Sequence, residues 1–296
     1  MLRLYLILIM LMGFWGYAFV GIKFLLEELS PLQLTVLRFF FVFLAIVFFM
    51  MYEIARGKLP PRIDASSFWK LFVLGFIGVV CYHMALNYGE IYTTASVASL
   101  IVFTSPVFTA ILSKLLLNEK LTVMRITGIL IALAGAALII LTENDGSAQN
   151  PNQAVFGALI VFISAVSWSL YTVYGRKIGG SLRGINRLYY SLYTMLFGSM
   201  VLILFVRPST IKALLNLSSY NLLNLLILSI FSSFFGYIIW IKALEHLEAN
   251  QVSAFLYLIP VFSVLFSVLL LGERIYPLMI AGAAAVFLGI YLTERG

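Results

Sequence analysis

The side chains best suited to binding a small polar solute lie inside long apolar stretches of the chain. Tyr82 and His83 are adjacent, and Asn87 follows His83 by four residues, which puts both on one face of a helix. Their hydroxyl, imidazole and amide groups can hydrogen-bond to a solute, and His83 is the one group there that titrates near neutral pH. We predict solute contacts at these residues; the alternative is a structural histidine satisfied by a neighbouring hydroxyl.

A second candidate set is mainly aromatic. Trp15 and Trp168 lie away from the ends of their apolar stretches, so anchoring at the membrane surface does not explain them. With other aromatic and hydroxyl side chains they can line an amphipathic pocket, although packing is the alternative for each one. The further members are Phe103, Tyr171, Tyr257, Ser99 and Ser253.

Arg38 is the only charged residue well inside an apolar stretch. A charge in a bilayer is costly and usually faces protein or water, so Arg38 can bind a solute carboxylate or tie helix ends together through carbonyl groups. All 12 Asp and Glu residues lie at the ends of stretches or in loops. Proton coupling through a mid-membrane carboxylate is therefore disfavoured, which leaves His83, with Glu90 as a second candidate.

Motifs of enzymes are absent from the sequence. It contains no Walker A, H-E-x-x-H or G-x-S-x-G pattern. Cys81 is the single cysteine, and the two histidines, His83 and His246, are far apart and lack further ligands. We therefore expect no enzyme, no cofactor and no metal site.

The elements that carry these residues are membrane-spanning helices. Of the 296 residues, 62% are hydrophobic and 10% are charged, and the mean hydropathy is +1.06, which excludes a soluble or disordered chain. Ten stretches free of Asp, Glu, Lys and Arg approach the length that a bilayer requires once the second is extended back across Arg38 to Gln33. They are Leu4–Ile22, Phe39–Tyr52, Leu71–Gly89, Ile91–Ser113, Ile126–Thr142, Gly146–Gly175, Leu188–Val206, Ala213–Ile241, Ala249–Gly272 and Ile275–Thr293.

Basic residues predict the orientation. If the N-terminus is cytoplasmic, 14 of the 19 Lys and Arg residues fall on the cytoplasmic side and four on the other, with Arg38 inside a span. We therefore predict a multi-pass protein of the cell (inner) membrane with both termini in the cytoplasm. The net charge of +7 follows from this topology, so we expect no nucleic-acid partner.

The chain contains an internal repeat at an offset of 154 residues. SPVFTAILSKLLLNEKL in the first half matches IPVFSVLFSVLLLGERI in the second, and Trp15 matches Trp168 at an offset of 153. Each copy holds five spans, and because five is odd the second copy enters the membrane inverted. We assign the copies to residues 1–145 and 146–296. Transporters use inverted repeats to open alternately to the two sides of a membrane, although a duplication kept only for stability is the alternative.

The repeat pairs two prolines and two glutamates. Pro106 and Pro260 lie inside their spans and are predicted to kink them, either as gates or for packing. Glu119 and Glu273 lie at span ends, where they can cap the next helix or pair with Lys120 and Arg274. We interpret the glutamates as structural latches.

Small residues recur at a spacing of four in the fifth and tenth spans, which permits a close helix contact. The positions are Gly128, Ala132 and Ala136, and Ala281, Ala285 and Gly289. The two spans are expected to pack on each other or to form a dimer face.

The sequence resembles EamA-type members of the drug/metabolite transporter superfamily. The residues that carry the resemblance are Phe14-Trp15-Gly16, Pro31, Arg38, the two Pro…Glu-Lys/Arg…Gly blocks, and Ala85-Leu86-Asn87-Tyr88-Gly89 followed by Tyr92-Thr93-Thr94-Ala95. The last of these is similar to amino-acid and metabolite exporters. The resemblance implies a central cavity surrounded by spans 1, 3, 4, 6, 8 and 9, with spans 5 and 10 at the periphery, and alternating access.

We therefore predict an all-α membrane protein that exports small organic solutes, amino acids or related metabolites. A lipid or prenyl-carrier flippase and a nucleotide-sugar or other metabolite exchanger of the same fold remain alternatives, as do a membrane-embedded enzyme and a receptor. The expected partners are a small-molecule solute and membrane lipids, with the protein as a monomer or homodimer.

Overall fold

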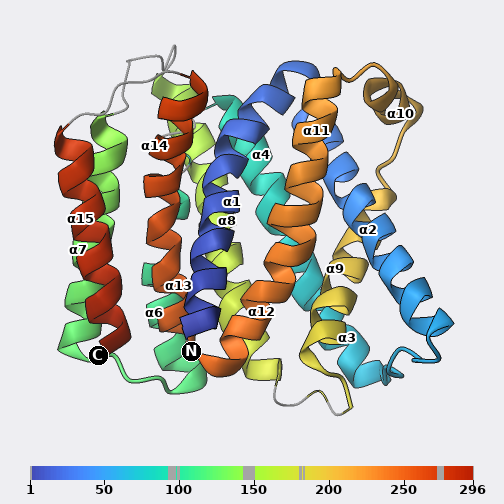
Figure 1. Ribbon diagram of the computed structural model, residues 1–296, viewed down its shortest axis with the longest axis horizontal. Coiled ribbons are helices and arrows are strands. Elements are labelled where there is room, and N and C mark those ends of the chain that lie inside the picture. The colour runs from blue at the N-terminus through green and yellow to red at the C-terminus, as the bar shows by residue number, and fades with distance from the viewer. Residues whose placement is uncertain are drawn as a thin grey trace.

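The chain folds into a bundle of helices whose two termini lie at the same end (Figure 1). The computed structural model describes residues 2–92, 98, 101–142, 151–179, 182, 184–271 and 277–295, and over these residues it contains helices and no strands. Ser99, Glu273 and the predicted boundary between residues 145 and 146 lie outside the described residues.

The two halves of the chain contain similar series of helices. The first half consists of α1 (Leu2–Glu28), α2 (Pro31–Ala55), α3 (Ala65–Gly75), the π-helix η1 (Phe76–Cys81), α4 (Tyr82–Tyr92), α6 (Ser105–Leu117) and α7 (Val123–Thr142). The second consists of α8 (Pro151–Gly179), α9 (Arg187–Ile203), α10 (Pro208–Leu215), α11 (Ser219–Ile227), the π-helix η2 (Leu228–Phe235), α12 (Gly236–His246), α13 (Ala249–Ala254), the 3₁₀-helix η3 (Phe255–Tyr257), α14 (Leu258–Leu271) and α15 (Pro277–Arg295).

Several of these helices are long and apolar enough to cross a membrane. Five described segments qualify on their own: Leu2–Glu28, Pro31–Ala55, Ala65–Tyr92, Val155–Gly179 and Ser219–His246. A sixth results if α9 and α10, which meet at an angle of 106°, are counted as one span. Shorter apolar helices cover Ser105–Leu117, Val123–Gly135, Ala249–Ser263 and Ile280–Thr293. These lengths are those of a polytopic α-helical membrane protein.

Polar residues fix where helices begin. The N–H of Gln33 donates to the Ser30 hydroxyl, and the Ser30 N–H donates to the Gln33 side chain, so this capping box starts α2. Asp64 starts α3 by accepting a hydrogen bond of 3.1 Å from the N–H of Ser67. These caps define the ends of apolar segments that have few polar residues of their own.

The two helices α7 and α15 pack against each other through their small residues. A Cβ added to Gly128 would lie 2.7 Å from the carbonyl oxygen of Gly289, and one added to Gly135 would lie 2.6 Å from that of Gly282. Because the contact partners run backwards along α15, the pair is antiparallel. The sequence predicts either a contact between the fifth and tenth spans or a dimer face, and the structure contains the contact between the two spans.

The helical run around each proline is interrupted, whereas the sequence predicts a kink within a span. A turn at residues 103–104 precedes α6, and Pro106 occupies its first turn. In the second half η3 precedes α14, and Pro260 is the third residue of α14. Proline is tolerated in the first turn because the N–H that it lacks has no intrahelical partner there.

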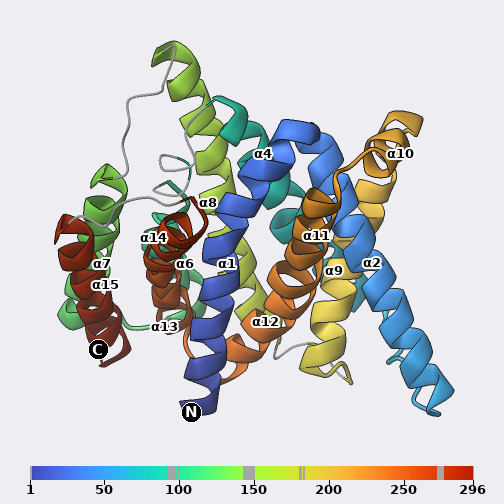
Figure 2. The same ribbon diagram turned by 45° about the horizontal axis from the view of Figure 1, so that its top comes forward.

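Helices from both halves surround the middle of the bundle. In both views α1 stands at the centre, with the α7–α15 pair at one edge and α2 at the other (Figures 1 and 2). Within the bundle α1 packs against α14, α6 against α8, and α2 against α9. These contacts place the centre of α1 beside residues of the second half.

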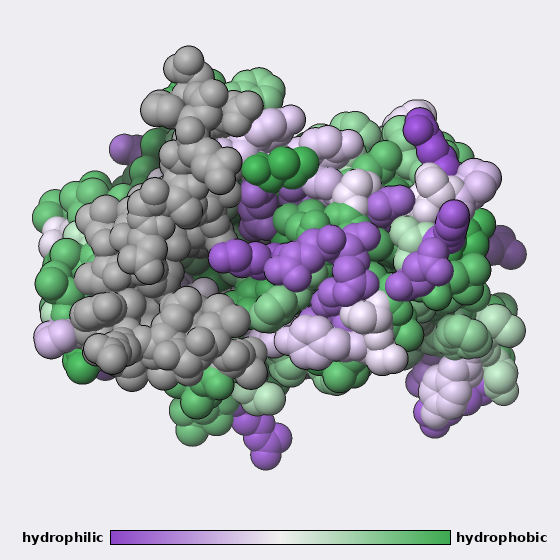
Figure 3. Space-filling view, turned by 90° about the horizontal axis from the view of Figure 1, so that it is seen from above, coloured by the Kyte–Doolittle hydropathy of each residue, from purple (hydrophilic) through white to green (hydrophobic). Residues whose placement is uncertain are grey.

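The end of the bundle opposite the termini has a polar middle. Seen from this end, hydrophilic side chains gather across the centre with apolar side chains around them (Figure 3). Exposed charged residues at this end include Glu27 and Glu28 at the end of α1, Arg207, and Lys212 of α10. The edges of the bundle are apolar, as expected for a surface that faces lipid tails.

Candidate functional site

A cavity lies at the junction of the two halves. Its free space is about 580 Å³, which includes the open space at its mouth. It is lined by Trp15, Ala18, Phe19 and Ile22 of α1; Arg38 of α2; Tyr82, His83 and Leu86 of α4; Val102 and Phe103 before α6; Trp168 of α8; Ser232 of η2; Tyr237 of α12; Leu256 of η3; and Ile259 of α14. The α7–α15 pair contributes no residue to this lining.

The structure brings six of the eleven predicted pocket residues together in this lining: Trp15, Arg38, Tyr82, His83, Phe103 and Trp168. Asn87, Tyr171 and Tyr257 are fully buried and lie outside the lining. Asn87 donates a hydrogen bond of 2.8 Å to the Thr35 hydroxyl of α2, so it joins two helices. Ser99 lies outside the described residues.

Tyr171 and Tyr257 are buried close to the cavity. Tyr171 contacts Trp168 of the lining, and Tyr257 follows Leu256 of the lining in the chain. The ring of Tyr171 stacks on that of Trp168 at 5.3 Å and 30°. The hydroxyls of Tyr171, Tyr257 and Ser253 have no hydrogen-bond partner among the described residues. The interior therefore holds three further buried hydroxyls that have no described partner.

Four aromatic rings form one continuous wall of the cavity. The rings of Trp15 and Trp168 meet edge to face at 5.2 Å and 87°, and Trp168 also contacts Tyr82 at 5.1 Å and Tyr237 at 5.8 Å. Behind them Trp240 is fully buried, 5.3 Å from Trp15. Such edge-to-face pairs hold their rings in fixed orientations, so the wall has a defined shape.

Tyr237 was not among the residues predicted from the sequence. The offset of 154 residues maps His83 onto Tyr237, so the repeat contained the signal that could have identified it. The two side chains meet in the structure, with 3.2 Å between His83 Nε2 and the Tyr237 hydroxyl. The contact therefore joins equivalent positions of the two halves.

The hydrogen bonds of Tyr237 determine the tautomer of His83. The Tyr237 hydroxyl donates its proton to the carbonyl oxygen of Gly78 in η1. It can then only accept from His83 Nε2, so Nε2 carries the proton of the neutral ring and Nδ1 is an acceptor. This Nδ1 is buried and has no partner among the described residues.

The two tryptophans of the cavity differ in their hydrogen bonding. Trp15 Nε1 donates to the carbonyl oxygen of Ser232 in η2 at 2.8 Å. Trp168 Nε1 is buried and has no acceptor among the described residues. Trp168 Nε1 and His83 Nδ1 are therefore a buried donor and a buried acceptor of the cavity wall that have no partner in the described part of the chain.

Arg38 provides the positive charge of the cavity. Only 3% of its surface is exposed, and its Nε donates a hydrogen bond of 2.8 Å to the hydroxyl of Ser233. No described carboxylate lies within ion-pair distance of its guanidinium group. Glu90 interacts with Arg38 electrostatically at longer range.

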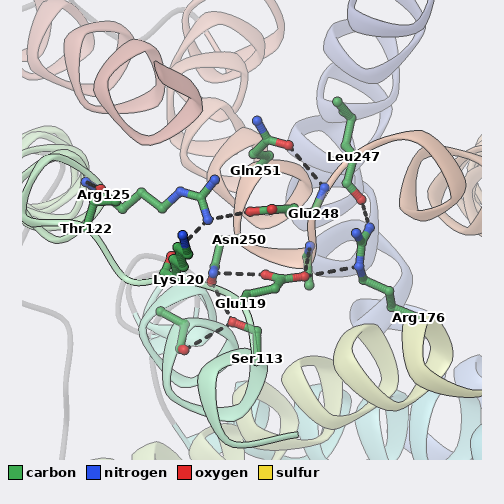
Figure 4. Close-up of polar contacts among 12 residues, drawn as sticks. Ser113, Glu119, Lys120, Thr122, Arg125, Arg176, Leu247, Glu248, Asn250 and Gln251 are labelled. Atoms are coloured by element: carbon green, nitrogen blue, oxygen red, sulfur yellow. Dashed lines mark hydrogen bonds and ion pairs between the residues drawn. The ribbon is translucent and has the colours of Figure 1, made fainter. Parts of the chain in front are cut away.

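A polar network links helices of both halves at the end of the bundle that carries both termini. Glu119 follows α6 and is buried, and its carboxylate accepts hydrogen bonds of 3.0 Å from the Ala249 N–H and from the Asn250 side chain (Figure 4). It also forms an ion pair with Arg176 of α8, with 3.0 Å between Oε1 and Nε. Ser113 of α6 donates to the Asn250 side chain at 3.1 Å. The network joins α6, α8 and the start of α13.

The partners of Glu119 differ from those predicted. The ion pair is with Arg176 and not with Lys120, and the capped helix is α13 of the other half and not α7, the next helix. The backbone of Asn118 has a φ of 55°, which turns the chain sharply between α6 and Glu119. The carboxylate is thereby directed across the bundle. Glu273, the second predicted latch, lies outside the described residues.

The all-helical fold, its apolar segments and its central polar-and-aromatic cavity define the class of the protein, a polytopic membrane transporter. The model of the EamA-like transporter family matches the chain twice, over residues 3–141 and 155–295. The chain belongs to this family, and it is a multi-pass membrane transporter and not an enzyme.

Proteins of similar sequence are transporters as well. The chain is 35% identical to an uncharacterized transporter of Archaeoglobus fulgidus, with 99% of each chain covered. It is 27% identical to a probable amino-acid metabolite efflux pump of Escherichia coli, over 95% of this chain and 91% of that one. It is 26% identical to a probable terminal-alkyne amino-acid exporter of Streptantibioticus cattleyicolor, over 95% and 90%.

A solved crystal structure has the same fold. It superposes with a TM-score of 0.77 over 99% of this chain and 96% of that one, at 19% sequence identity. At this identity the similarity describes the fold alone.

Proposed function

We propose that the protein exports small organic solutes, amino acids or related metabolites, across the cell membrane by alternating access. The observation that carries the proposal is the cavity, which residues of both halves line and which contains unpaired polar groups. Two relatives whose names refer to amino-acid export support the solute class. The solute would bind in this cavity, with the candidate contacts Tyr82, His83, Phe103, Trp15, Trp168 and Arg38.

The proposed architecture is ten spans in two inverted five-helix repeats, 1–145 and 146–296. Two matches to one family model support the duplication. Five long spans, one bent pair and four shorter apolar helices agree in number with ten. The offset of 154 residues relates α1 to α8 and α6 to α14. The contact of α1 with α14 therefore corresponds to the contact of α8 with α6, and such a pair of equivalent contacts between the halves is what an inverted repeat requires.

Two equivalent π-helices support the alternating mechanism. Residues 76–81 of η1 correspond at the offset of 154 to residues 230–235, which lie within η2. Gly78 corresponds to Ser232, and the carbonyl oxygen of each accepts a hydrogen bond from an aromatic residue of the cavity, Tyr237 and Trp15. Interruptions of this kind frequently mark functional sites in helices. They would let the halves of each span move relative to each other beside the solute, and the breaks before Pro106 and Pro260 would do the same.

The proposed orientation places both termini in the cytoplasm. The termini lie at one end of the bundle, where most basic residues of the connections are expected from the sequence (Figure 1). In this orientation the Glu119 network lies on the cytoplasmic side.

The proposal is tested by the flux of labelled amino acids through liposomes that contain the purified protein. His83→Ala and Trp168→Ala should lower the flux, whereas Trp69→Ala, which removes a tryptophan that is 62% exposed on α3, should leave it unchanged. Insertion and size-exclusion profiles should be the same for all three variants. Normal flux in both cavity variants would refute the assigned site, and movement of fluorescent lipids without amino-acid flux would favour a flippase.

A further inference from the structure

We infer that the transported solute carries a carboxylate and that Arg38 is the residue that binds it. The inference rests on the proposed function and adds the charge of the solute and its orientation in the cavity. Arg38 lines the cavity and is 97% shielded from solvent, since only 3% of its surface is exposed. A cation in such a place is stable only with a partner of opposite charge or with acceptors for its protons.

The described residues leave most of the guanidinium group available. Arginine has five N–H donors in a planar fork, and the structure uses the Nε proton, which binds the Ser233 hydroxyl. Neither terminal amino group donates a hydrogen bond to a described residue. A carboxylate matches the geometry of this pair of groups, because it can accept two parallel hydrogen bonds from one guanidinium.

No described carboxylate forms an ion pair with the guanidinium group of Arg38. Glu90 affects Arg38 electrostatically but forms no ion pair with it, and one Glu90 carboxylate oxygen, Oε1, is buried without a described partner. Tyr82 and Tyr237 also lie in the electrostatic surroundings of Arg38. An arriving carboxylate would therefore not have to displace an existing salt bridge.

The remaining polar groups complement the other end of such a solute. His83 Nδ1 can accept a hydrogen bond from an ammonium or amide group, and Trp168 Nε1 can donate one to a second oxygen. Both residues line the same cavity as Arg38. The rest of the lining is apolar, with Ile22, Leu86 and Val102 available to an aliphatic body.

The test uses three probes that share one branched aliphatic body: leucine, 4-methylpentanoate, which lacks the ammonium, and isoamylamine, which lacks the carboxylate. Binding to the purified full-length protein is measured by calorimetry and exchange in liposomes. We expect leucine and 4-methylpentanoate to bind and isoamylamine to bind roughly 10- to 100-fold more weakly, the change that follows from losing charge-assisted hydrogen bonds.

Variants separate anion binding from a structural role. Arg38→Met should lose leucine and 4-methylpentanoate but not change the weak binding of isoamylamine, and Arg38→Lys should restore part of the preference for the anions. Ser233→Ala removes the described hydrogen bond of Arg38 but leaves its charge, so it should bind leucine far better than Arg38→Met. If Arg38 only joined α2 to η2, the two variants would behave alike.

Two results would overturn the inference while leaving the proposed function intact: equal binding of isoamylamine and leucine by the unmodified protein, or unchanged leucine binding in Arg38→Met. Failure of leucine and of a mixture of the twenty amino acids to bind or exchange would instead refute the proposed function, and this inference with it. The comparison of probes on the unmodified protein needs no variant, so a folding defect of Arg38→Met would not remove the test.

Discussion

Replacing Glu119 with glutamine is expected to loosen the end of the bundle that carries both termini. The side chain of Glu119 is only 6% exposed, and its carboxylate is bound by the Ala249 N–H, the Asn250 amide and Arg176. Glutamine has the same shape, so the change removes charge and one acceptor without creating a cavity. Its amino group would face at least one of the donors that the carboxylate oxygen now binds.

The expected cost follows from these contacts. A hydrogen bond to a charged group contributes about 1.5–3 kcal/mol, and leaving a buried donor unpaired adds about 1–3 kcal/mol. Arg176 is 28% exposed and keeps access to water, which reduces the share of the ion pair. We therefore expect a loss of about 2–4 kcal/mol, or roughly a 30- to 1,000-fold change in the ratio of closed to open forms of this end.

Two measurements report this change. The melting temperature of the purified protein should fall by a few degrees. In a Cys81→Ser background, a single cysteine at Ala18 in the cavity should react faster with a membrane-impermeant maleimide added from the side of the termini. The reaction should be followed in vesicles of known orientation.

Glu245→Gln is the matched control. It removes an ion pair with Arg187, also at 28% exposure, but the Glu245 side chain is 41% exposed and the distance is 3.6 Å. An exposed pair of this kind is worth about 0–1 kcal/mol. If Glu119→Gln and Glu245→Gln had the same melting temperature and the same maleimide rate, the network would not hold this end closed.

Three further predictions concern packing, hydrogen bonding and pH. Gly289→Leu should lower the thermal unfolding temperature, because a Cβ at this position would lie 2.5 Å from backbone atoms of α7. Ala284→Leu, on the exposed side of α15, is the control and should leave the unfolding temperature unchanged. Trp15→Phe and Trp168→Phe remove the same ring volume, but Trp15→Phe also loses a hydrogen bond, whereas Trp168→Phe loses none to a described residue; Trp15→Phe should therefore unfold at the lower temperature of the two, and Trp168→Phe should weaken solute binding, measured by calorimetry. Hydrogen bonds from Ser67 hold the pKa of the Asp64 carboxyl below its usual value. The ionised Asp64 side chain therefore stabilises the protein above about pH 4, and this stabilisation is lost as the pH falls through the folded-state pKa. In Asp64→Ala this part of the pH dependence of the melting temperature should disappear.

The apolar segments could be predicted from the sequence because the bilayer imposes their length and composition. The same is true of the close contact between α7 and α15, since small residues at a spacing of four leave a groove along one helix face. The π-helices could not be predicted. A shift from i+4 to i+5 hydrogen bonding leaves no compositional signal in FIGVVC or LSIFSSFF, because both segments have the composition of an ordinary apolar membrane helix.

The site was harder to predict because periodicity assigns residues to a helix face but not to a depth. Asn87 follows His83 by four residues and lies one turn further along α4, where it meets Thr35 and not the cavity. Tyr171 lies one turn beyond Trp168 and stacks under it. Partners from distant helices, such as Arg176 for Glu119, depend on how the two halves pack, which neighbouring residues do not specify.

The two cavity tryptophans differ in their hydrogen bonds, which bears on the proposed alternating mechanism. Trp15 and Trp168 occupy positions that the repeat relates, yet Trp15 donates to the carbonyl oxygen of Ser232 while the equivalent acceptor for Trp168, Gly78, is taken by Tyr237. The two halves therefore differ in their hydrogen bonds around the cavity, and they differ in sequence there as well, since His83 stands in the first half where the second has Tyr237. A carrier that opens to one side at a time requires such a difference, because each state is the other with the roles of the halves exchanged. Under the proposed mechanism, Trp168 Nε1, which has no partner among the described residues, is the donor that gains one when the exchange occurs.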